Sequence, residues 1–245
     1  MMIDVNCDVG EGINNEKDLL PFISSCNIAC GGHAGDAKTI ERVISLAKQY
    51  NVKVGAHPSF PDRENFGRKV IDISPNELKK SLENQILLLK DSAQHQAVTL
   101  HHVKPHGALY NLAAIDQKVA ELVVDVVLKC CSKVFLYVPY QSEIASVAKQ
   151  KGLPIKYEVF ADRNYNDDLT LVSRNNDHAL IQTKEKVLSH VLNMYRANKV
   201  TTVTGQEIPI LVDTFCIHGD SSNAVELVKY LFEELKNYNI KIAKA

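Results

Sequence analysis

The sequence lacks several features that would place a protein quickly in one class. It has no run of about 18 consecutive apolar residues, which a membrane-spanning helix needs. It begins MMIDVNCDVGEG, without the basic segment and apolar core of a secretory leader. Its six cysteines include no Cys-x-x-Cys pair. We therefore expect a reduced, cytoplasmic protein whose cysteines are small buried thiols.

An excess of charge of one sign is also absent. The chain has 28 Lys and Arg against 29 Asp and Glu, a formal net charge of −1 and a pI near 6.7. Proteins that bind nucleic acid or anionic membranes usually carry a strongly basic surface, so we expect neither partner. With 45% hydrophobic residues and no linker or repeat, the sequence predicts one domain over residues 1–245.

Two common catalytic motifs are missing as well. The chain contains no G-x-x-x-x-G-K-S/T segment, so any ATP site in it is not a P-loop. It contains no H-E-x-x-H segment, which excludes a zinc protease of that type.

What the sequence does contain is an alternation of short β-branched runs and amphipathic helical patterns. Strict β-α alternation predicts a mainly parallel sheet, and seven such units favour an α/β barrel over an open doubly wound sheet. We predict a single irregular seven-stranded β/α barrel, with a small β-hairpin inserted near 199–212. The predicted strands are 2–6, 26–30, 52–56, 99–104, 133–138, 155–160 and 209–217, and the predicted helices lie near 36–50, 75–94, 114–131, 141–151, 178–198 and 222–238.

Charged and histidine residues gather after the predicted strands rather than before them. In a parallel α/β barrel the loops after the strands converge on one face, which is where active sites lie. We therefore expect a single site built from these loops. Its candidate residues, in chain order, are Asn6, Asp8, Glu11, His33, Asp36, His57, Arg63, Arg68, Lys104, His106, Tyr110, Asp162, Arg163, His218 and Asp220.

Simpler explanations exist for some of these residues. Asp36 and Asp220 stand where helix N-caps are expected, which alone would account for them. Asp8, His33 and His57 have the ligand types of a His-His-carboxylate metal site, although their separation in sequence makes that pattern weak.

Six segments together resemble the LamB/YcsF family, in the same order along the chain. The segments are VNCDVGEG, NIACGGHAGD, GAHPSFPDRENFGR, VKPHGALYN, EVFADRNY and IHGD. The resemblance spans about residues 3–235 and implies a barrel related to glycoside hydrolases and deacetylases. It also implies ATP-driven opening of 5-oxo-L-proline to L-glutamate, with ATP and Mg²⁺, by the A subunit of a 5-oxoprolinase that works with B and C subunits. Self-association stays open.

The implied reaction assigns roles to the candidate residues. A lactam carbonyl is a poor electrophile, and phosphorylation of its oxygen would let water attack it; such a site needs cations and a general base. We expect Asp8, Glu11, His57, Lys104 and His106 to be catalytic and the other candidates to bind substrate or phosphate. Two alternatives remain: a stand-alone metal-dependent amide hydrolase or deacetylase, and a non-catalytic subunit that binds substrate.

The chain departs from the family pattern in two places. Asp168 and Leu169 stand where the family has Asp-Gly, and Ser221 and Ser222 follow IHGD where a proline is common. The first departure lies in the loop near 166–178, so the shape of that loop does not follow from the resemblance.

Overall fold

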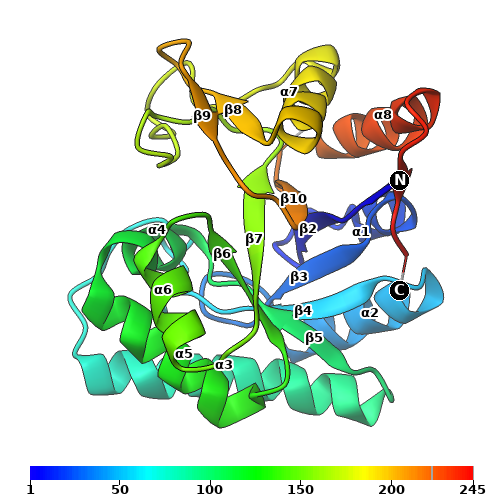
Figure 1. The fold of residues 1–245 in the computed structure, drawn as a ribbon. Coiled ribbons are helices and arrows are strands. Elements are labelled where there is room, and N and C mark those ends of the chain that lie inside the picture. Colours follow the sequence, from blue (N-terminus) through cyan, green and yellow to red (C-terminus); the bar gives the residue numbers. More distant parts are fainter. Residues whose placement is uncertain (222, 245) are drawn as a thin grey trace.

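A closed barrel of seven parallel strands forms the centre of the protein (Figure 1). The computed structural model describes residues 1–221 and 223–244. The strand order is β10-β2-β3-β4-β5-β6-β7, and each neighbouring pair is parallel. This confirms the predicted barrel. The strands are β2 (Val5–Val9), β3 (Ser25–Ala29), β4 (Lys53–His57), β5 (Leu100–Val103), β6 (Phe135–Pro139), β7 (Ile155–Phe160) and β10 (Thr214–Ile217).

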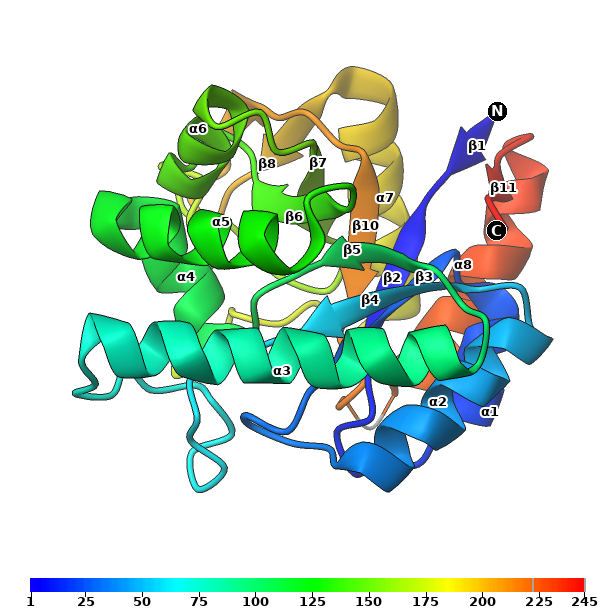
Figure 2. The ribbon, with the colours of Figure 1, turned by 90° about the horizontal axis from the view of Figure 1, so that it is seen from below.

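Helices cover the outside of the barrel, and Figure 2 shows α3 running alongside it. In α2, Ile40, Val43, Ile44 and Ala47 recur every three to four residues and are buried against the strands, as one face of an amphipathic helix requires. The helices are α1 (Glu16–Leu19), the 3-10 helix η1 (Leu20–Phe22), α2 (Ala37–Gln49), α3 (Pro75–His95), α4 (Gly107–Ile115), α5 (Gln117–Cys131), α6 (Glu143–Gln150), α7 (Lys184–Ala197) and α8 (Ala224–Asn237).

The inside of the barrel is polar, whereas the hydrophobic core lies between the barrel and its helices. Along β2, Val5, Cys7 and Val9 belong to the hydrophobic core, and the alternate residues Asn6 and Asp8 hydrogen bond to residues of other strands. Successive side chains of a strand point to opposite faces, so the apolar residues of β2 face the helices and the polar residues face the inside of the barrel. The barrel thus delivers polar groups toward its axis.

The start of the chain differs from the prediction. The predicted strand 2–6 is two strands: β1 (Met2–Ile3) pairs with β11 (Lys241–Ile242), and β2 begins at Val5. The prediction also ended the first strand at residue 6. Asn6 and Asp8 therefore lie within β2 rather than after it. A continuous buried segment has no periodicity that marks where it ends.

Helix boundaries moved in the middle of the chain. The predicted helix 114–131 corresponds to α5 and the last two residues of α4, most of which was not predicted. The two helices are separate because Asp116 is extended and its carboxylate caps α5 through the Val119 N–H at 3.0 Å. Helix α7 begins at Lys184 rather than at 178, since the preceding residues form a loop. Ser74 and Glu77 form a capping box at the start of α3.

The end of the chain confirms the hairpin and shortens a strand. Strands β8 (Lys199–Thr201) and β9 (Glu207–Pro209) are antiparallel, as predicted. The last barrel strand covers Thr214–Ile217 rather than 209–217, because the hairpin ends at Pro209 and residues 210–213 connect it to the barrel. The predicted start of the last helix, Ser222, lies outside the described residues.

The structure shows the state of the cysteines and the length and apolar character of the helices. All six cysteines fall within the described residues, and each is buried and unpaired. Among the helices that the structure describes, none combines the length and apolar character needed to cross a membrane.

Candidate active site

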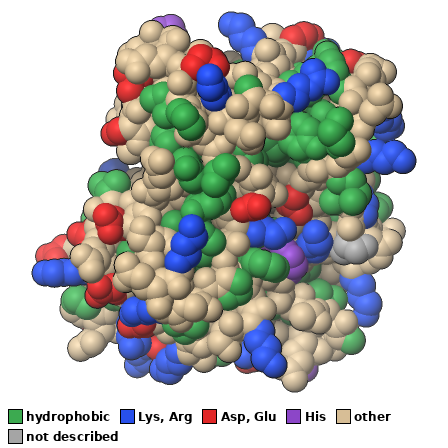
Figure 3. Space-filling view, viewed as in Figure 1, with side chains coloured by type: hydrophobic (Ala, Val, Ile, Leu, Met, Phe, Trp, Pro, Cys, Tyr) green, Lys and Arg blue, Asp and Glu red, His purple; other side chains and the backbone are tan. Residues whose placement is uncertain are grey.

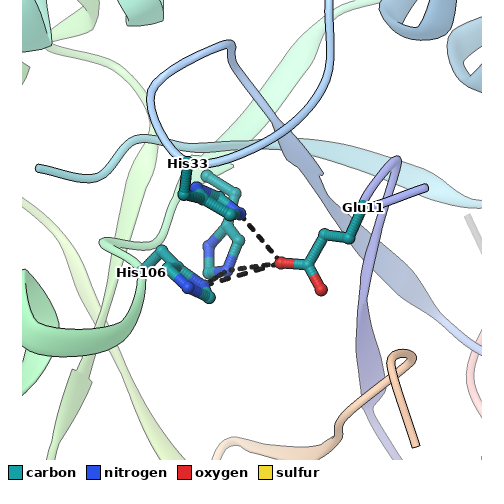
Figure 4. A group of neighbouring side chains, drawn as sticks. Glu11, His33 and His106 are labelled. Carbon is teal, nitrogen blue, oxygen red and sulfur yellow. Dashed lines mark hydrogen bonds and ion pairs between the residues drawn. The ribbon is translucent and has the colours of Figure 1, made fainter. Parts of the chain in front are cut away.

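Polar side chains from four strand ends meet at the carboxyl-terminal end of the barrel. Glu11 follows β2, His33 lies in the turn after β3, His57 ends β4, and His106 is the N-cap of α4 after β5. Figure 4 shows Glu11, His33 and His106 pointing toward one another from these separate segments. We call these three residues and His57 the Glu–His cluster.

Glycines let the loops around the cluster approach closely. Gly35 has φ +78°, and a Cβ there would lie 2.6 Å from the carbonyl oxygen of Ala29, so the turn that carries His33 must fold back on its own strand. Gly107 has φ +54°, and its Cβ would lie 2.6 Å from the Gly67 carbonyl oxygen. Its contact with Gly67 holds the loop after β4 against the first turn of α4, next to His106.

The Glu–His cluster is tightly packed. Glu11 Oε1 lies 2.9 Å from His33 Nε2, 3.6 Å from His106 Nδ1 and 3.9 Å from His57 Nε2. His106 Nδ1 lies 2.9 Å from His57 Nε2, and the rings of His33 and His106 stack with centroids 3.7 Å apart. The histidines are buried, with at most 5% of each exposed. These four residues are the group with the geometry to hold a metal ion among the described residues.

A buried lysine, Lys104, lies beside the cluster and contacts three side chains. Lys104 Nζ lies 2.9 Å from Asp8 Oδ1, 2.9 Å from Glu158 Oε1 and 3.1 Å from Cys216 Sγ. Two of these contacts, to Asp8 Oδ1 and Cys216 Sγ, are hydrogen bonds that the ammonium donates, and the contact with Glu158 is an ion pair. Lys104 therefore positions Asp8, and its catalytic role stays a prediction.

The environment pushes the pKa values of the two carboxyls apart. Burial would raise the pKa of Asp8, but the charges of His57 and Lys104 hold it well below its ordinary value. For Glu11, burial and the Asp8 charge raise the pKa well above its ordinary value. Burial lowers the pKa of His33 to about 2. At neutral pH Asp8 is thus the ionised member of the pair.

A chain of hydrogen bonds inside the barrel, from His102 through Asn27, holds Asp8 in place. Asn27 Nδ2 donates to Asp8 Oδ1 at 2.7 Å, and Asn27 Oδ1 lies 2.6 Å from His102 Nε2. An amide oxygen only accepts, so His102 carries its proton on Nε2. Gly55 makes room for this ring, because a Cβ there would lie 2.0 Å from His102 Nε2.

The outer candidates surround the cluster at the surface. Arg63 donates to the Gly35 carbonyl oxygen, and Arg68 pairs with Asp220 across the loops after β4 and β10. The Asp162 carboxylate accepts from the His218 backbone N–H and faces its Nδ1, both at 3.0 Å. Figure 3 shows acidic, basic and histidine side chains side by side near the middle of one face.

Four predicted residues have other contacts. Asp36 caps α2 through the Thr39 N–H at 2.8 Å, the simpler role expected of it. Arg163 donates to the carbonyl oxygens of Val172 and Ala179, which ties together its own loop. Asn6 bonds to Thr214, nearer the amino-terminal end of the barrel. Tyr110 is buried on α4, and its hydroxyl has no hydrogen-bond partner among the described residues.

Sequence reasoning missed Glu158 and Asn27. Each lies inside a strand with an apolar residue on either side of it in the sequence, and neither follows a strand end. The available signal was alternation: Lys156 and Glu158 are polar at every second position of β7, as the inward face of a barrel strand allows.

Comparison with known proteins places the chain in a family. The sequence profile of the LamB/YcsF family matches residues 3–245. The chain belongs to the LamB/YcsF family. Relatives that are named as the A subunit of 5-oxoprolinase include one from Clostridium beijerinckii, 41% identical over 98% of this chain and 96% of its own length. Another from Histophilus somni is 42% identical over 99% of this chain and 98% of its own length.

Solved structures agree with the family assignment. A lactam utilization protein from Thermus thermophilus superimposes with a TM-score of 0.93 at 32% identity, covering 100% of both chains. A GH113 β-1,4-mannanase matches with a TM-score of 0.53 at 13% identity, over 89% of this chain and 88% of its own. The second likeness concerns the fold alone and agrees with the predicted glycoside-hydrolase-like barrel.

Proposed function

We propose that this chain is the A subunit of a 5-oxoprolinase, which opens the lactam of 5-oxo-L-proline to give L-glutamate with hydrolysis of ATP. The observation that carries the proposal is the similarity, over nearly the full length of both chains, to relatives that bear that name. The buried, charge-rich site at the carboxyl-terminal end of the barrel supplies groups that such a reaction needs.

In the proposed reaction, Asp8 is the base that accepts a proton from the attacking water. Its Oδ1 is held by Lys104 and Asn27, and its Oδ2 faces His57 Nε2 at 3.5 Å. Two fixed contacts on one oxygen orient the carboxylate, and the other oxygen remains the one that can meet water. Lys104 acts as a positioning residue that keeps Asp8 ionised inside the protein.

The Glu–His cluster would contact the lactam and its activated form. Glu11, His57 and His106 lie beside Asp8 and line the space from which the ring nitrogen leaves. His33 completes the wall of the site through its stack on His106.

Binding of phosphate and of the substrate carboxylate requires cations nearer the surface. Arg63 and Arg68 lie on the loop after β4, next to the turn that carries His33, and both are exposed. Arginine presents paired N–H groups suited to such anions. We assign ATP and Mg²⁺ to the assembled enzyme with B and C subunits, and Arg68 and Asp220 to the rim where the nucleotide or substrate meets this chain.

The proposal is tested by purifying the chain alone and with its B and C partners. ATP hydrolysis and glutamate formation are measured separately with 5-oxoproline present. We expect both activities in the complex, and Asp8→Asn to lower glutamate formation on the order of a thousandfold. Asp116→Asn, the same change at the cap of α5, should retain activity. Full activity of the Asp8→Asn complex would reject the assigned role.

Two other functions make different predictions in the same assay. A stand-alone amide hydrolase, favoured by the metal-like geometry of the cluster, would release product from the isolated chain without ATP. A subunit that only binds substrate would show weaker 5-oxoproline binding in cluster variants but unchanged turnover at saturation.

A further inference from the structure

In the Glu–His cluster, the tautomers of His57 and His106 place two hydrogen-bond acceptors face to face. His57 Nδ1 lies 2.7 Å from the Lys104 carbonyl oxygen, and His106 Nε2 lies 3.0 Å from the Phe66 carbonyl oxygen. Carbonyl oxygens only accept hydrogen bonds, so each of these nitrogens carries a proton. In neutral rings the remaining nitrogens, His57 Nε2 and His106 Nδ1, hold lone pairs, and they face each other at 2.9 Å.

The Glu11 carboxyl and the His33 ring bring two further possible ligand atoms to the same place. Glu11 Oε1 lies 3.6 Å from His106 Nδ1 and 3.9 Å from His57 Nε2, and His33 Nε2 lies 2.9 Å from the same oxygen. The two lone pairs of His57 Nε2 and His106 Nδ1 repel each other in this buried space unless a positive centre lies between them. The arrangement therefore favours a cation at the point where the four atoms converge.

We propose that Glu11, His33, His57 and His106 bind one divalent transition-metal ion of the zinc type. The ligand atoms are Glu11 Oε1, His33 Nε2, His57 Nε2 and His106 Nδ1, which all lie within 4.8 Å of one another. The inference deepens the proposed function, on which it rests for its catalytic meaning, but binding itself is a property of this chain.

The spacing of the four atoms fits a small ion. Bonds of about 2.0–2.1 Å at tetrahedral angles place ligand atoms roughly 3.3 Å apart. The distances from Glu11 Oε1 to the three nitrogens, and between the His57 and His106 nitrogens, run from 2.9 to 3.9 Å.

The support behind the ligands is also that of a metal site. Metal-binding histidines commonly donate their second N–H to a carbonyl or carboxylate, which fixes the ring and exposes the ligating lone pair. His57 and His106 do so to the carbonyl oxygens of Lys104 and Phe66. Three imidazoles and one carboxylate favour zinc-type ions over Mg²⁺, which prefers oxygen ligands.

The ligand set differs from the one suggested by sequence. Asp8 was grouped with His33 and His57, but its Oδ1 is held by Lys104 and Asn27. Glu11 and His106 take the place of Asp8 in the proposed site. Asp8 then stays free to act as a base beside the ion.

The test is metal binding by the isolated chain after treatment with a chelator. Calorimetric titration should find one Zn²⁺ or Co²⁺ per chain and no comparable binding of Mg²⁺. Bound Co²⁺ should give the visible absorption of a nitrogen- and oxygen-ligated tetrahedral ion. Binding of Mg²⁺ as tight as that of Zn²⁺, or no binding of either transition metal, would overturn the proposal in favour of a proton shared between His57 and His106.

Variants separate this site from adventitious surface binding. His33→Gln and His106→Gln should each weaken Zn²⁺ binding by roughly a hundredfold or more, beyond the typical effect of losing a supporting partner. His178→Gln makes the same change on an exposed loop and should bind like the parent chain. Unchanged affinity in both cluster variants would refute the site.

Two further measurements keep the result interpretable. Circular dichroism checks that each variant is folded, and if a glutamine variant is not, the Co²⁺ spectrum of the parent chain decides. ATP-coupled glutamate formation by the complex is measured independently. A chain without metal binding in an active complex rejects the metal site alone, and a metal-binding chain in an inactive complex rejects the proposed function alone.

Discussion

The two ends of the barrel interior are both polar, but they are built differently. At the amino-terminal end, Asp4 Oδ1 accepts from Thr214 Oγ1 at 2.7 Å and from Ser25 Oγ at 3.2 Å, and Asp4 Oδ2 pairs with Lys53 at 3.3 Å. Each acceptor there faces a donor. At the carboxyl-terminal end, lone pairs of His57 and His106 face each other. A satisfied network supports the fold, whereas an unsatisfied one indicates a place for a ligand.

The largest expected difference between the two ends comes from their lysines. Lys104→Met leaves Asp8 and Glu158 buried without their cation, which should lower the free energy of unfolding by about 3–5 kcal/mol and abolish activity of the complex. Lys53→Met makes the same change at the other end, where the lysine side chain is 24% exposed, and should cost about 1 kcal/mol or less. Urea unfolding measures both, and equal losses would break the comparison.

A second expected effect concerns the hydrogen bonds from His102 through Asn27 to Asp8, which join the two ends of the barrel interior. Gly55→Ala places a methyl group 2.0 Å from His102 Nε2, so the ring must move and its bond to Asn27 is lost. We expect a loss of about 2–3 kcal/mol in unfolding free energy and lower activity, because Asn27 holds Asp8. In the double variant with His102→Ala the clash disappears, so the two changes should not add. Additive losses would show that the ring is not displaced.

A smaller effect is expected from the amino-terminal network alone. Thr214→Val removes the donor to Asp4 and the acceptor for Asn6, and should cost about 1–2 kcal/mol in thermal or urea unfolding. Activity should stay within a few-fold of the parent, and Thr214→Ser should restore stability. A large loss of activity with little loss of stability would mean that this end also serves the reaction.

The smallest expected effect is a pH dependence at the same end. Burial and the charges of Lys156 and Lys53 lower the pKa of His101 from 6.5 to about 4. The unfolded chain therefore binds more protons below about pH 6.5, and the stability that the neutral ring contributes is lost as pH falls. Between about pH 7 and about pH 5.5 the parent should lose about 1 kcal/mol more than His101→Gln. Parallel pH profiles of unfolding would contradict this.

Residues at strand ends were predictable, whereas residues inside strands were not. His57 and His106 could be placed from sequence because parallel strands bring their carboxyl ends to one face. Glu158 could not, since a charged residue within an apolar run does not reveal which side of the strand it occupies. Asp8 was found as a candidate but placed after its strand, because a fully buried strand has no visible end.

Arginines were the least predictable group. Arg163 follows β7 as a substrate-binding cation would, yet its guanidinium bonds to Val172 and Ala179 within the loop near 163–181. Nothing in the spacing of that segment indicates how the loop folds back on itself. The pairing of Arg68 with Asp220, which are 152 residues apart, likewise depends on barrel closure.

Barrel closure has a consequence for how the protein is made. Asn6 and Thr214 are 208 residues apart in sequence but adjacent in space, and Cys216 on the same late strand contacts Lys104. A nascent polypeptide leaving the ribosome has all the residues of the Glu–His cluster long before it has β10. The ammonium of Lys104 acquires its last neighbour, Cys216, when translation is nearly over, so the working centre is completed late.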